Sequence, residues 1–388
     1  MFVGAAAGLD SRDRGLAQRI AYGTIQRVRT LDHAIEALGR RQVRRLDPPV
    51  RAALRIAAYQ LGFLDAVPAH AAVGESVELV RVAGLERAVA FTNAVGRRLA
   101  AGMRELVSAL PEETPTEAAL YHSYPDWVAE IWWRDLGADQ ARALMRAQNE
   151  PAPTVVRRNR LRDGDVAGRP DPDIPDALHV DRVDETALAA GLVFPQSVGS
   201  QLAGLAVAAQ PGDRVLDLCA APGAKATQLA ERAAEVVAVD VHPGRARELE
   251  QNVRLLGAGN VRVVNADALA LPEEWTGFDR VLVDAPCSGL GVLAGRPDLR
   301  WRARPLAELQ AALLRVAAQR VGPGGTIVYS VCTVNADESE AVVDASGLEP
   351  EDLGRVWPRF RHRRRPEFLQ TLPDRDRTSG FFIARLRT

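Results

Sequence analysis

Cysteines, metal-binding motifs and long apolar runs are scarce or missing in this sequence of 388 residues. Three cysteines are too few for a disulfide framework, and the odd number leaves at least one thiol free. No HExxH motif and no C-x-x-C pair occurs, so we expect no metal site. No apolar run approaches the roughly 18 residues of a transmembrane helix, and no basic segment precedes the first apolar residues. We therefore expect a cytoplasmic protein without a signal peptide or a membrane partner.

The charge is nearly balanced overall but uneven along the chain. The formal net charge is −1, so any site for a polyanion has to be a local patch. Residues 1–100 contain 15 arginines against 9 acidic residues, including the closely spaced Arg40, Arg41, Arg44 and Arg45. Two interpretations of this cluster remain open: a solvated helix face, or a surface that binds a polyanion.

Residues 1–108 have the apolar spacing of an all-helical domain. Apolar residues recur mainly three and four positions apart, the period of a helix with one buried face: Leu54, Ala57, Ala58, Leu61 and Leu64, then Val77, Val80 and Val82, then Ala88, Phe91, Val95 and Leu99. Residues 109–118 are polar and carry two prolines, so we interpret them as a linker. Residues 119–190 form a mixed lead-in segment, with a helix predicted over 125–133 and a strand over 154–159.

From residue 191 onward, apolar runs alternate with helical segments. Five runs have the length of buried strands: Val215–Cys219, Val236–Asp240, Val261–Asn265, Val281–Ala285 and Thr326–Ser330. Strands that alternate with helices predict a mostly parallel sheet with helices on both faces, so 191–388 is a predicted α/β domain of the Rossmann-like class. A last run at Phe381–Leu386 has no crossover helix before it, which favours an antiparallel edge strand.

Chemically distinctive residues follow the predicted strands. The carboxyl ends of the strands line the ligand-binding edge of such a sheet. All three cysteines, the only lysine and three carboxylates map to this edge: Cys219, Lys225, Asp240, Asp267, Asp284, Cys287 and Cys332. The loop 220–225 is rich in small residues, but it has neither GxGxxG nor the phosphate-binding GxxxxGK[ST] motif. These features favour S-adenosylmethionine, an adenosyl ligand with a cationic, phosphate-free end, over a dinucleotide.

Lysine occurs once in the chain. The other 48 basic residues are arginines, and Lys225 stands in the loop after the first strand of the α/β domain. Genomic composition bias accounts for the ratio but not for the position of the exception. Because a compact ammonium differs chemically from a guanidinium fork, we predict that Lys225 either holds the loop or contacts the substrate.

Several stretches resemble the Nol1/Nop2/Sun group of RNA cytosine-C5 methyltransferases. The four that carry the resemblance are DLCAAPGAKATQLAE (217–231), VLVDAPCSGLGVLAGRPDLRWR (281–302), GGTIVYSVCTVNADESE (324–340) and SGFFIAR (379–385). The lead-in of that family is similar to SYPDWVAEIWWRDLG (123–137), PTVVRRN (153–159) and FPQSVGSQLAG (194–204). Residues 1–108 look like the antitermination factor NusB, notably RAALRIAAYQLGFLDAVP (51–68). The family usually has other residues at four positions, which are Ala224, Leu290, Val331 and Ser379.

The resemblance implies a seven-stranded, mostly parallel Rossmann-like domain at 191–388 that follows a NusB-like RNA-binding domain at 1–108 and an RNA-contacting segment at 119–190. It implies S-adenosylmethionine-dependent methylation of carbon 5 of a cytosine in small-subunit ribosomal RNA. From their positions after the strands, we expect Asp240 to accept hydrogen bonds from ribose hydroxyls and Asp267 to reach the adenine edge. The full set of expected cofactor residues is Cys219, Ala220, Ala221, Pro222, Gly223, Ala224, Lys225, Asp240, Arg245, Asp267 and Asp284. We also expect RNA backbone contacts from Arg157, Arg158 and Asn159, and from the tail arginines Arg359, Arg361, Arg363, Arg364 and Arg365.

Two cysteines could act as the nucleophile, and their spacing does not choose between them. A thiolate that adds to C6 of cytosine activates C5 for methylation, and the base has to be flipped out of its stack to be reached. The resemblance implies Cys332 as the nucleophile and Cys287 in product release. It also implies that Asp284, when protonated, pairs with N3 of the base.

Two other functions remain as alternatives. An RNA-binding ribosome-assembly factor could retain a vestigial methyltransferase fold, but the intact set of Asp284, Cys287 and Cys332 argues against it. A dinucleotide-dependent oxidoreductase is disfavoured by the missing GxGxxG motif. The sequence does not specify the oligomeric state and is compatible with a monomer.

Overall fold

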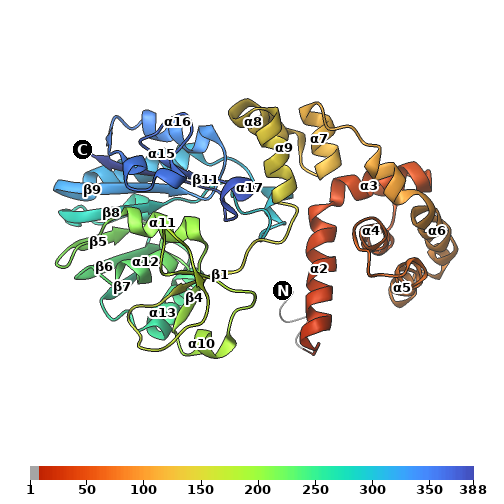
Figure 1. Ribbon diagram of the computed structural model, residues 1–388, viewed down its shortest axis with the longest axis horizontal. Coiled ribbons are helices and arrows are strands. Elements are labelled where there is room, and N and C mark those ends of the chain that lie inside the picture. Colours follow the sequence, from red (N-terminus) through yellow and green to blue (C-terminus); the bar gives the residue numbers. More distant parts are fainter. Residues whose placement is uncertain (1–7) are drawn as a thin grey trace. The chain divides into compact units, whose positions relative to one another are not determined.

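The computed structural model describes residues 8–388 and shows two compact units (Figure 1). The first unit extends to Asn149 and also includes Arg296–Arg302. The second unit consists of Glu150–Gly295 and Ala303–Thr388. The division after Asn149 falls inside the segment 119–190, because the helices before it pack with the first unit and the strands after it belong to the second.

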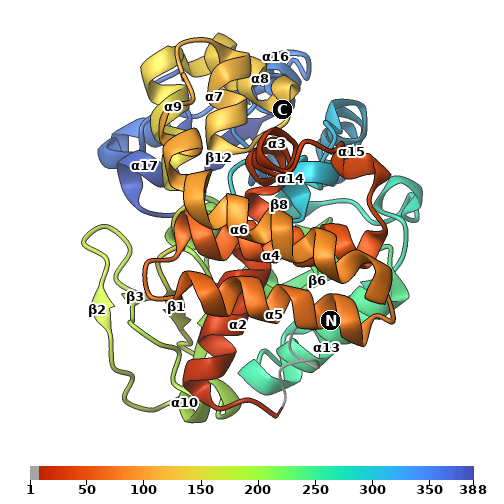
Figure 2. The same cartoon turned by 90° about the vertical axis from the view of Figure 1, so that its right-hand side faces the viewer.

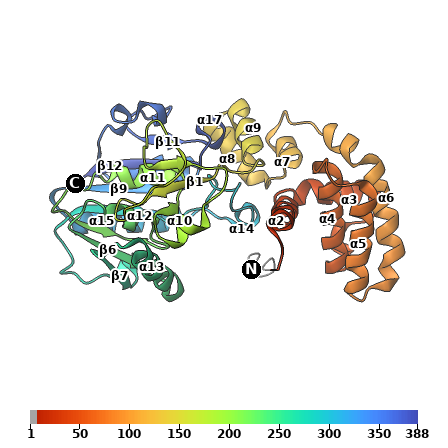
Figure 3. The ribbon, with the colours of Figure 1, turned by 60° about the horizontal axis from the view of Figure 1, so that its bottom comes forward.

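Helices make up the first unit (Figure 2, Figure 3). They are α2 (Ser11–Gln26), α3 (Val28–Gly39), α4 (Pro48–Phe63), α5 (Ala69–Val82), α6 (Glu86–Ser108), α7 (Pro115–His122), α8 (Asp126–Leu136), α9 (Ala138–Ala147) and α14 (Leu299–Arg302), with the 3-10 turn η1 (Val43–Arg45). Helices α4, α5 and α6 pack against one another, and α3 packs on α4 and α6. The all-helical prediction is thus confirmed for the described residues.

The buried faces of this bundle follow the predicted spacing, with one exception. Leu54, Ala57, Ala58 and Leu61 of α4 are all buried. Two prolines begin α4, where their missing N–H groups cost nothing. Val82 was expected on the buried face of α5, but it is 79% exposed. It is the last residue of α5, two positions after the buried Val80, so it points away from the core.

The predicted linker is shorter in the structure than the sequence indicates. Helix α6 ends at Ser108 and α7 begins at Pro115. Thr114 and Glu117 form a capping box: the Thr114 side chain accepts from the N–H of Glu117, and the Glu117 carboxylate accepts from the N–H of Thr114. This reciprocal cap explains why α7 begins directly after the polar stretch.

A segment from the last quarter of the sequence, Arg296–Arg302, completes the first unit. Arg300 is fully buried there, and its guanidinium donates to the carbonyl of Gln26 at 2.8 Å and to the hydroxyl of Tyr124 at 2.9 Å. The guanidinium also lies 3.8 Å from the centre of the Tyr124 ring. Burial lowers the pKa of Arg300 to about 10. The RPDLRWR end of the 281–302 motif therefore has its partners among the helices.

The second unit begins with a small antiparallel sheet in the order β2-β3-β1-β4. Its strands are β1 (Val155–Arg158), β2 (Arg169–Pro170), β3 (Ala177–His179) and β4 (Val193–Pro195), with α10 (Glu185–Ala189) between the last two. The strand predicted over 154–159 corresponds to β1 and is confirmed.

The main sheet of the second unit is mostly parallel. Its strands are β5 (Arg214–Asp217), β6 (Glu235–Asp240), β7 (Val261–Asn265), β8 (Phe278–Asp284), β9 (Val321–Val331), β10 (Glu349–Pro350), β11 (Leu369–Thr371) and β12 (Phe381–Arg387). Within residues 8–388, seven of them lie in the order β10-β12-β9-β8-β5-β6-β7, and β11 adds an eighth by pairing with β12. Figure 1 shows the part of this order from β9 to β7. The strands from β9 to β7 are parallel and β12 is antiparallel, as predicted.

Helices cover both faces of this sheet. Buried residues of α11 (Val198–Ala206), α12 (Ala224–Leu229) and α13 (Pro243–Leu256) share one core with the sheet. Buried residues of α15 (Ala307–Arg320) and α16 (Glu340–Asp344) share the other. The short α17 (Pro373–Asp376) precedes β12. Within residues 8–388, every helix is too short or too polar to span a bilayer.

Candidate active site

Two thiols meet at the carboxyl edge of the main sheet. Cys287 lies in the loop after β8, and Cys332 directly follows β9. Because β8 and β9 are parallel neighbours, these positions lie side by side although 45 residues separate them in sequence. The two sulfur atoms are 3.4 Å apart and are not bonded covalently. The structure therefore brings together the two cysteines that the sequence singled out.

The pKa values of the two thiols are shifted in opposite directions. The pKa of Cys332 is lowered, first by its hydrogen bond with Cys287; burial and the charge of Asp284 oppose the shift, and the Lys225 ammonium assists it. The pKa of Cys287 is raised well above its usual value, because this hydrogen bond and burial both retain its proton. Cys332 is therefore the more acidic thiol of the pair, and a thiolate is the nucleophilic form of cysteine.

Lys225 and Asp284 form an ion pair next to the thiols. The ammonium of Lys225, in the first turn of α12, lies 2.6 Å from one carboxylate oxygen of Asp284, which ends β8. The hydroxyl of Ser330 donates to the other oxygen of Asp284 at 2.6 Å. The Lys225 side chain is 8% exposed and its nitrogen lies 5.2 Å from the centre of the Phe381 ring. The only lysine of the chain is thus enclosed and directed at Asp284.

Two side chains of α13 donate hydrogen bonds to backbone carbonyls of the loop between β5 and α12. Gly223 precedes α12 with a φ of +107°, and a Cβ at this position would lie 2.7 Å from a methyl carbon of Leu249. Arg245 donates to the carbonyl of Ala221 at 2.7 Å and lies 3.6 Å from Asp240. Asn252 donates to the carbonyl of Pro222 at 2.8 Å. Asn252 was not among the residues predicted for this site, although its spacing of seven from Arg245 puts both on one face of α13.

Carboxylates line the strand ends beside this loop. Asp240 ends β6 and accepts from the N–H of His242, and Asp267 follows β7 and accepts from the N–H of Leu269. Asp217 ends β5, is fully buried, and has one oxygen without a hydrogen-bond partner. Burial, helped by the negative charge of Asp284, raises the pKa of Asp217 to about 7. Sequence reasoning did not single out Asp217.

These residues fit S-adenosylmethionine. The small-residue loop permits close approach to its backbone, and the unpartnered oxygen of Asp217 suits a cationic group. The carboxylate of Asp240, at the end of the second strand, suits ribose hydroxyls. Cys219 remains a thiol beside this loop, because burial and the charge of Asp217 raise its pKa. Among residues 8–388, no group of three or more His, Cys, Asp or Glu side chains could hold a metal ion.

The departures from the family pattern are accommodated. Ala224 is the first residue of α12 and does not have a positive φ, so an alanine fits there. Val331 and Leu290 are fully buried. Ser379 contributes its carbonyl, which accepts from the Thr371 hydroxyl at 2.6 Å and needs no particular side chain.

Two of the expected RNA contacts are wrong. Arg157 and Asn159 are each 1% exposed and cannot reach an RNA backbone. Arg157 pairs with Glu231 and also donates to Gln196 at 2.8 Å. The Asn159 amide donates to the carbonyls of Gly191 and Leu256 at 2.8 Å each. Both side chains stabilise the second unit instead, because β1 is packed against the rest of that unit.

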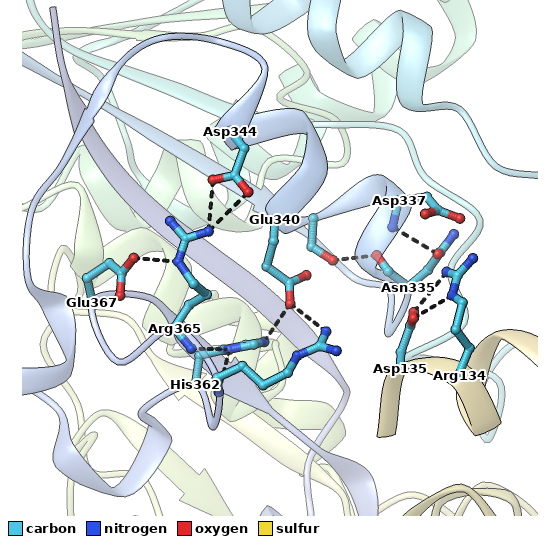
Figure 4. Close-up of polar contacts among 11 residues, drawn as sticks. Arg134, Asp135, Asn335, Asp337, Glu340, Asp344, His362, Arg365 and Glu367 are labelled. Atoms are coloured by element: carbon cyan, nitrogen blue, oxygen red, sulfur yellow. Dashed lines mark hydrogen bonds and ion pairs between the residues drawn. The ribbon is translucent and has the colours of Figure 1, made fainter. Parts of the chain in front are cut away.

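Some tail arginines also have protein partners. Arg359 donates to Asp171 and Asp173, and Arg364 donates to Glu340. Figure 4 shows Arg365 between the carboxylates of Asp344 and Glu367. The run of positive charge in the sequence is therefore largely matched by carboxylates that folding brings to it.

Comparison with known families gives two matches. Residues 204–387 match the family described as 16S rRNA methyltransferase RsmB/F, and residues 4–101 match the NusB family. A relative from Thermus thermophilus, named ribosomal RNA small subunit methyltransferase B, is 37% identical over 97% of this chain and 89% of its own length. A relative from Synechocystis sp., named probable ribosomal RNA small subunit methyltransferase B, is 32% identical over 98% of this chain and 92% of its own length.

Two solved structures from Pyrococcus horikoshii share the fold. A methyltransferase homologue has a TM-score of 0.62 and 25% identity, covering 72% of this chain and 100% of its own. NSun6, solved with the S-adenosylmethionine analogue SFG, has a TM-score of 0.62 and 22% identity, covering 69% of this chain and 98% of its own. The cofactor of the present chain is S-adenosylmethionine. The α/β unit, its loop and the extent of these matches together show that the chain belongs to the RsmB/F family of 16S rRNA methyltransferases and carries a NusB-family domain.

Proposed function

We propose that this protein is a cytoplasmic enzyme that transfers a methyl group from S-adenosylmethionine to carbon 5 of a cytosine in small-subunit ribosomal RNA. The reaction proceeds through a covalent bond between the sulfur of Cys332 and C6 of the base. The observation that carries this proposal is the contact of 3.4 Å between the sulfur atoms of Cys287 and Cys332, next to the Lys225–Asp284 ion pair.

The thiolate of Cys332 begins the reaction. Carbon 5 of cytosine is a poor nucleophile until a sulfur adds to C6, which turns C5 into an enamine carbon. The hydrogen bond from Cys287 and the nearby Lys225 ammonium favour this thiolate. S-adenosylmethionine, when bound, supplies the electrophilic methyl group that C5 then takes.

The Lys225–Asp284 pair stabilises the adduct. Addition at C6 moves an electron pair onto N3 of the base, and this charge is removed when N3 receives a proton. Both oxygens of Asp284 accept hydrogen bonds, from Lys225 and from Ser330, so the proton for N3 comes from the Lys225 ammonium by way of Asp284. This refines the expectation that Asp284 acts alone as a protonated acid.

Cys287 assists the last step. Once C5 carries the methyl group, a base takes the C5 proton and the electrons of that C–H bond re-form the C5–C6 double bond and expel the sulfur of Cys332. The thiol of Cys287, 3.4 Å away, can donate to the departing thiolate and so lowers its energy. This role explains why a second thiol next to the nucleophile would help product release.

Different residues would bind the cofactor and the RNA. The loop of Cys219, Ala220, Ala221, Pro222, Gly223, Ala224 and Lys225, with Asp240, Arg245, Asp267 and Asp284, would hold S-adenosylmethionine. In the first unit, the exposed residues Arg40, Arg41, Arg44 and Arg45 support RNA binding through phosphate contacts.

The direct test measures tritium transfer from labelled S-adenosylmethionine to small-subunit ribosomal RNA, with bisulfite sequencing to identify C5-methylated cytosines. Wild-type protein should transfer label to a cytosine, and Cys332→Ala should reduce transfer to background. Undiminished transfer by Cys332→Ala would overturn the nucleophile assignment. Label on a base that bisulfite sequencing does not report as C5-methylcytosine would overturn the assigned reaction.

A further inference from the structure

A buried carboxylate connects the two segments that carry the active-site thiols. Glu338 ends the 3-10 turn η3 (Ala336–Glu338), six residues after Cys332, and is 0% exposed. Its hydrogen bonds all go to residues outside the cofactor loop 219–225, and it has no part in the proposed methyl transfer. A fully buried carboxylate is costly unless several donors satisfy it.

Glu338 has such donors on both oxygens. One oxygen accepts from the N–H of Ser288 at 2.9 Å, the N–H of Leu306 at 3.0 Å and the side-chain amide of Gln310 at 3.0 Å. The other accepts from the hydroxyl of Ser288 and from the side-chain amide of Asn335 at 3.2 Å. Because backbone and amide N–H groups can only donate, the geometry requires an acceptor at both positions.

These contacts bracket Cys287. Ser288, which follows it, is bound to Glu338 through both its N–H and its hydroxyl. Gln310 of α15 uses the same amide nitrogen to donate to the carbonyl of Pro286, which precedes Cys287, at 2.8 Å. The peptide groups on both sides of this cysteine are thus tied, directly or through one amide, to Glu338.

The segment of Cys332 is tied to the same point. Thr333, which follows Cys332, has its hydroxyl 2.8 Å from that of Ser288. The Tyr329 hydroxyl, from the end of β9, donates to the backbone carbonyl of Glu338 at 2.6 Å. Both cysteine segments therefore converge on one buried residue.

We propose that Glu338 is a positioning residue that holds the sulfur atom of Cys287 within hydrogen-bonding distance of the sulfur atom of Cys332. The residue touches neither substrate nor cofactor and acts through the two loops. This inference rests on the proposed function only for its consequence in catalysis, because the sulfur contact is a feature of the protein chain itself.

The distance between the sulfur atoms controls the reactivity of Cys332. Hydrogen bonds weaken steeply as their geometry departs from the optimum, so a small displacement of either loop removes the donor. The charged and titratable groups that face Cys332 are Cys287, Asp284 and Lys225. Of these, Asp284 and Lys225 are held to each other and to Ser330, so the loss of Glu338 should remove mainly the contribution of Cys287.

The test is the pH dependence of thiol alkylation in Glu338→Gln. The full-length protein, without RNA or cofactor, is treated with iodoacetamide across a pH series, and mass spectrometry of peptides measures the rate for each cysteine separately. A glutamine keeps the size of the side chain, but its NH2 group would face N–H groups that now donate to the carboxylate of Glu338. We expect the pH midpoint of Cys332 alkylation to rise by about one unit, the order expected from losing a hydrogen bond to a charged group.

Glu340→Gln is the matched control. Glu340 is also a buried carboxylate, two residues along the chain, but its partners are Arg364 and His362. Figure 4 shows the contact with His362. Burial would raise the pKa of Glu340, yet the hydrogen bonds from His362 and Arg364 lower it to about 2, so the control also removes a buried carboxylate that several donors satisfy. It should lower the melting temperature without moving the alkylation midpoint. Cys287→Ala should move the midpoint upward as Glu338→Gln does.

The outcomes separate the possible roles of Glu338. A midpoint in Glu338→Gln equal to that of wild type, with a melting temperature lowered as in Glu340→Gln, would show a purely structural role and overturn the proposal. If Glu338→Gln does not fold, Gln310→Met, which removes the amide shared by Pro286 and Glu338, should give a smaller upward shift, and no shift would again overturn it. Since alkylation needs no methyl transfer, an enzyme that methylates another atom would refute the proposed function and leave this result standing.

Discussion

Replacement of Asp217 by asparagine should stabilise the protein at high pH and not at low pH. The carboxyl group is fully buried at the end of β5, and burial, with the neighbouring Asp284, raises its pKa to about 7, while Lys225 opposes the shift. In the unfolded chain the group titrates near 3.8. The folded state therefore binds this proton more tightly, and the stability present below pH about 4 is lost as the pH rises to about 7.

The size of this loss follows from the difference between the two pKa values. About three units correspond to about 4 kcal/mol, of which about 3 kcal/mol falls between pH 5 and pH 8. An asparagine is neutral at both values and does not incur the loss. At each pH, the melting temperature of Asp217→Asn is compared with that of wild type. In a domain of this size, this difference should be about 6 to 12 °C larger at pH 8 than at pH 5.

Differential scanning calorimetry at the two pH values measures this effect. Asp184→Asn is the control, because Asp184 is an exposed residue that caps α10 and asparagine caps a helix equally well. Its melting temperature should differ little from wild type at both values. A difference between Asp217→Asn and wild type that is the same at pH 5 and pH 8 would refute the assignment of a raised pKa to this buried group.

Three further predictions concern catalysis and RNA binding. Cys287→Ala should accumulate a covalent protein–RNA adduct that resists denaturant in a gel, since the departing thiolate loses its donor; free turnover without adduct would contradict this role. Lys225→Met should lower the single-turnover methylation rate about tenfold to a hundredfold, because a hydrogen bond to charged Asp284 is worth ~1.5–3 kcal/mol; an unchanged rate would exclude the proton path. The double substitution of Arg44 and Arg45 by glutamine should reduce the slope of log affinity for RNA against log salt by about one to two, and an unchanged slope would mean that these side chains are only solvated.

Much of the candidate site could be predicted from the sequence because the order of strands and loops along the chain determines which residues share a sheet edge. Alternating strands and helices indicate parallel strands, and parallel neighbours end at the same edge. The position of Cys287 after β8 and of Cys332 after β9 was therefore enough to predict that they meet. The same argument placed Lys225 and Asp284 at this edge, but it did not predict that they form an ion pair.

The network around these residues could not be predicted in this way. Nothing in the local sequence of Glu338 distinguishes it from Glu340, yet one contacts both cysteine loops and the other binds the tail. Likewise the charge of Arg157 is visible in the sequence, but its burial against Glu231 is not. Tail arginines that look free for RNA, such as Arg365, have carboxylate partners.

The amino-acid order alone was sufficient to predict periodic features: which helix faces are apolar, where strands end, and which reactive groups follow them. These depend on short-range spacing, which is the same in any context. The burial of a polar side chain, its donors and hence its pKa depend on segments far apart in the chain, such as β5 beside β8 around Asp217. Long-range packing sets the local dielectric and the hydrogen-bond partners of each buried group. Folding therefore determined that Glu338 contacts both cysteine loops, that Asp284 pairs with Lys225, and that the pKa of Asp217 is raised to about 7.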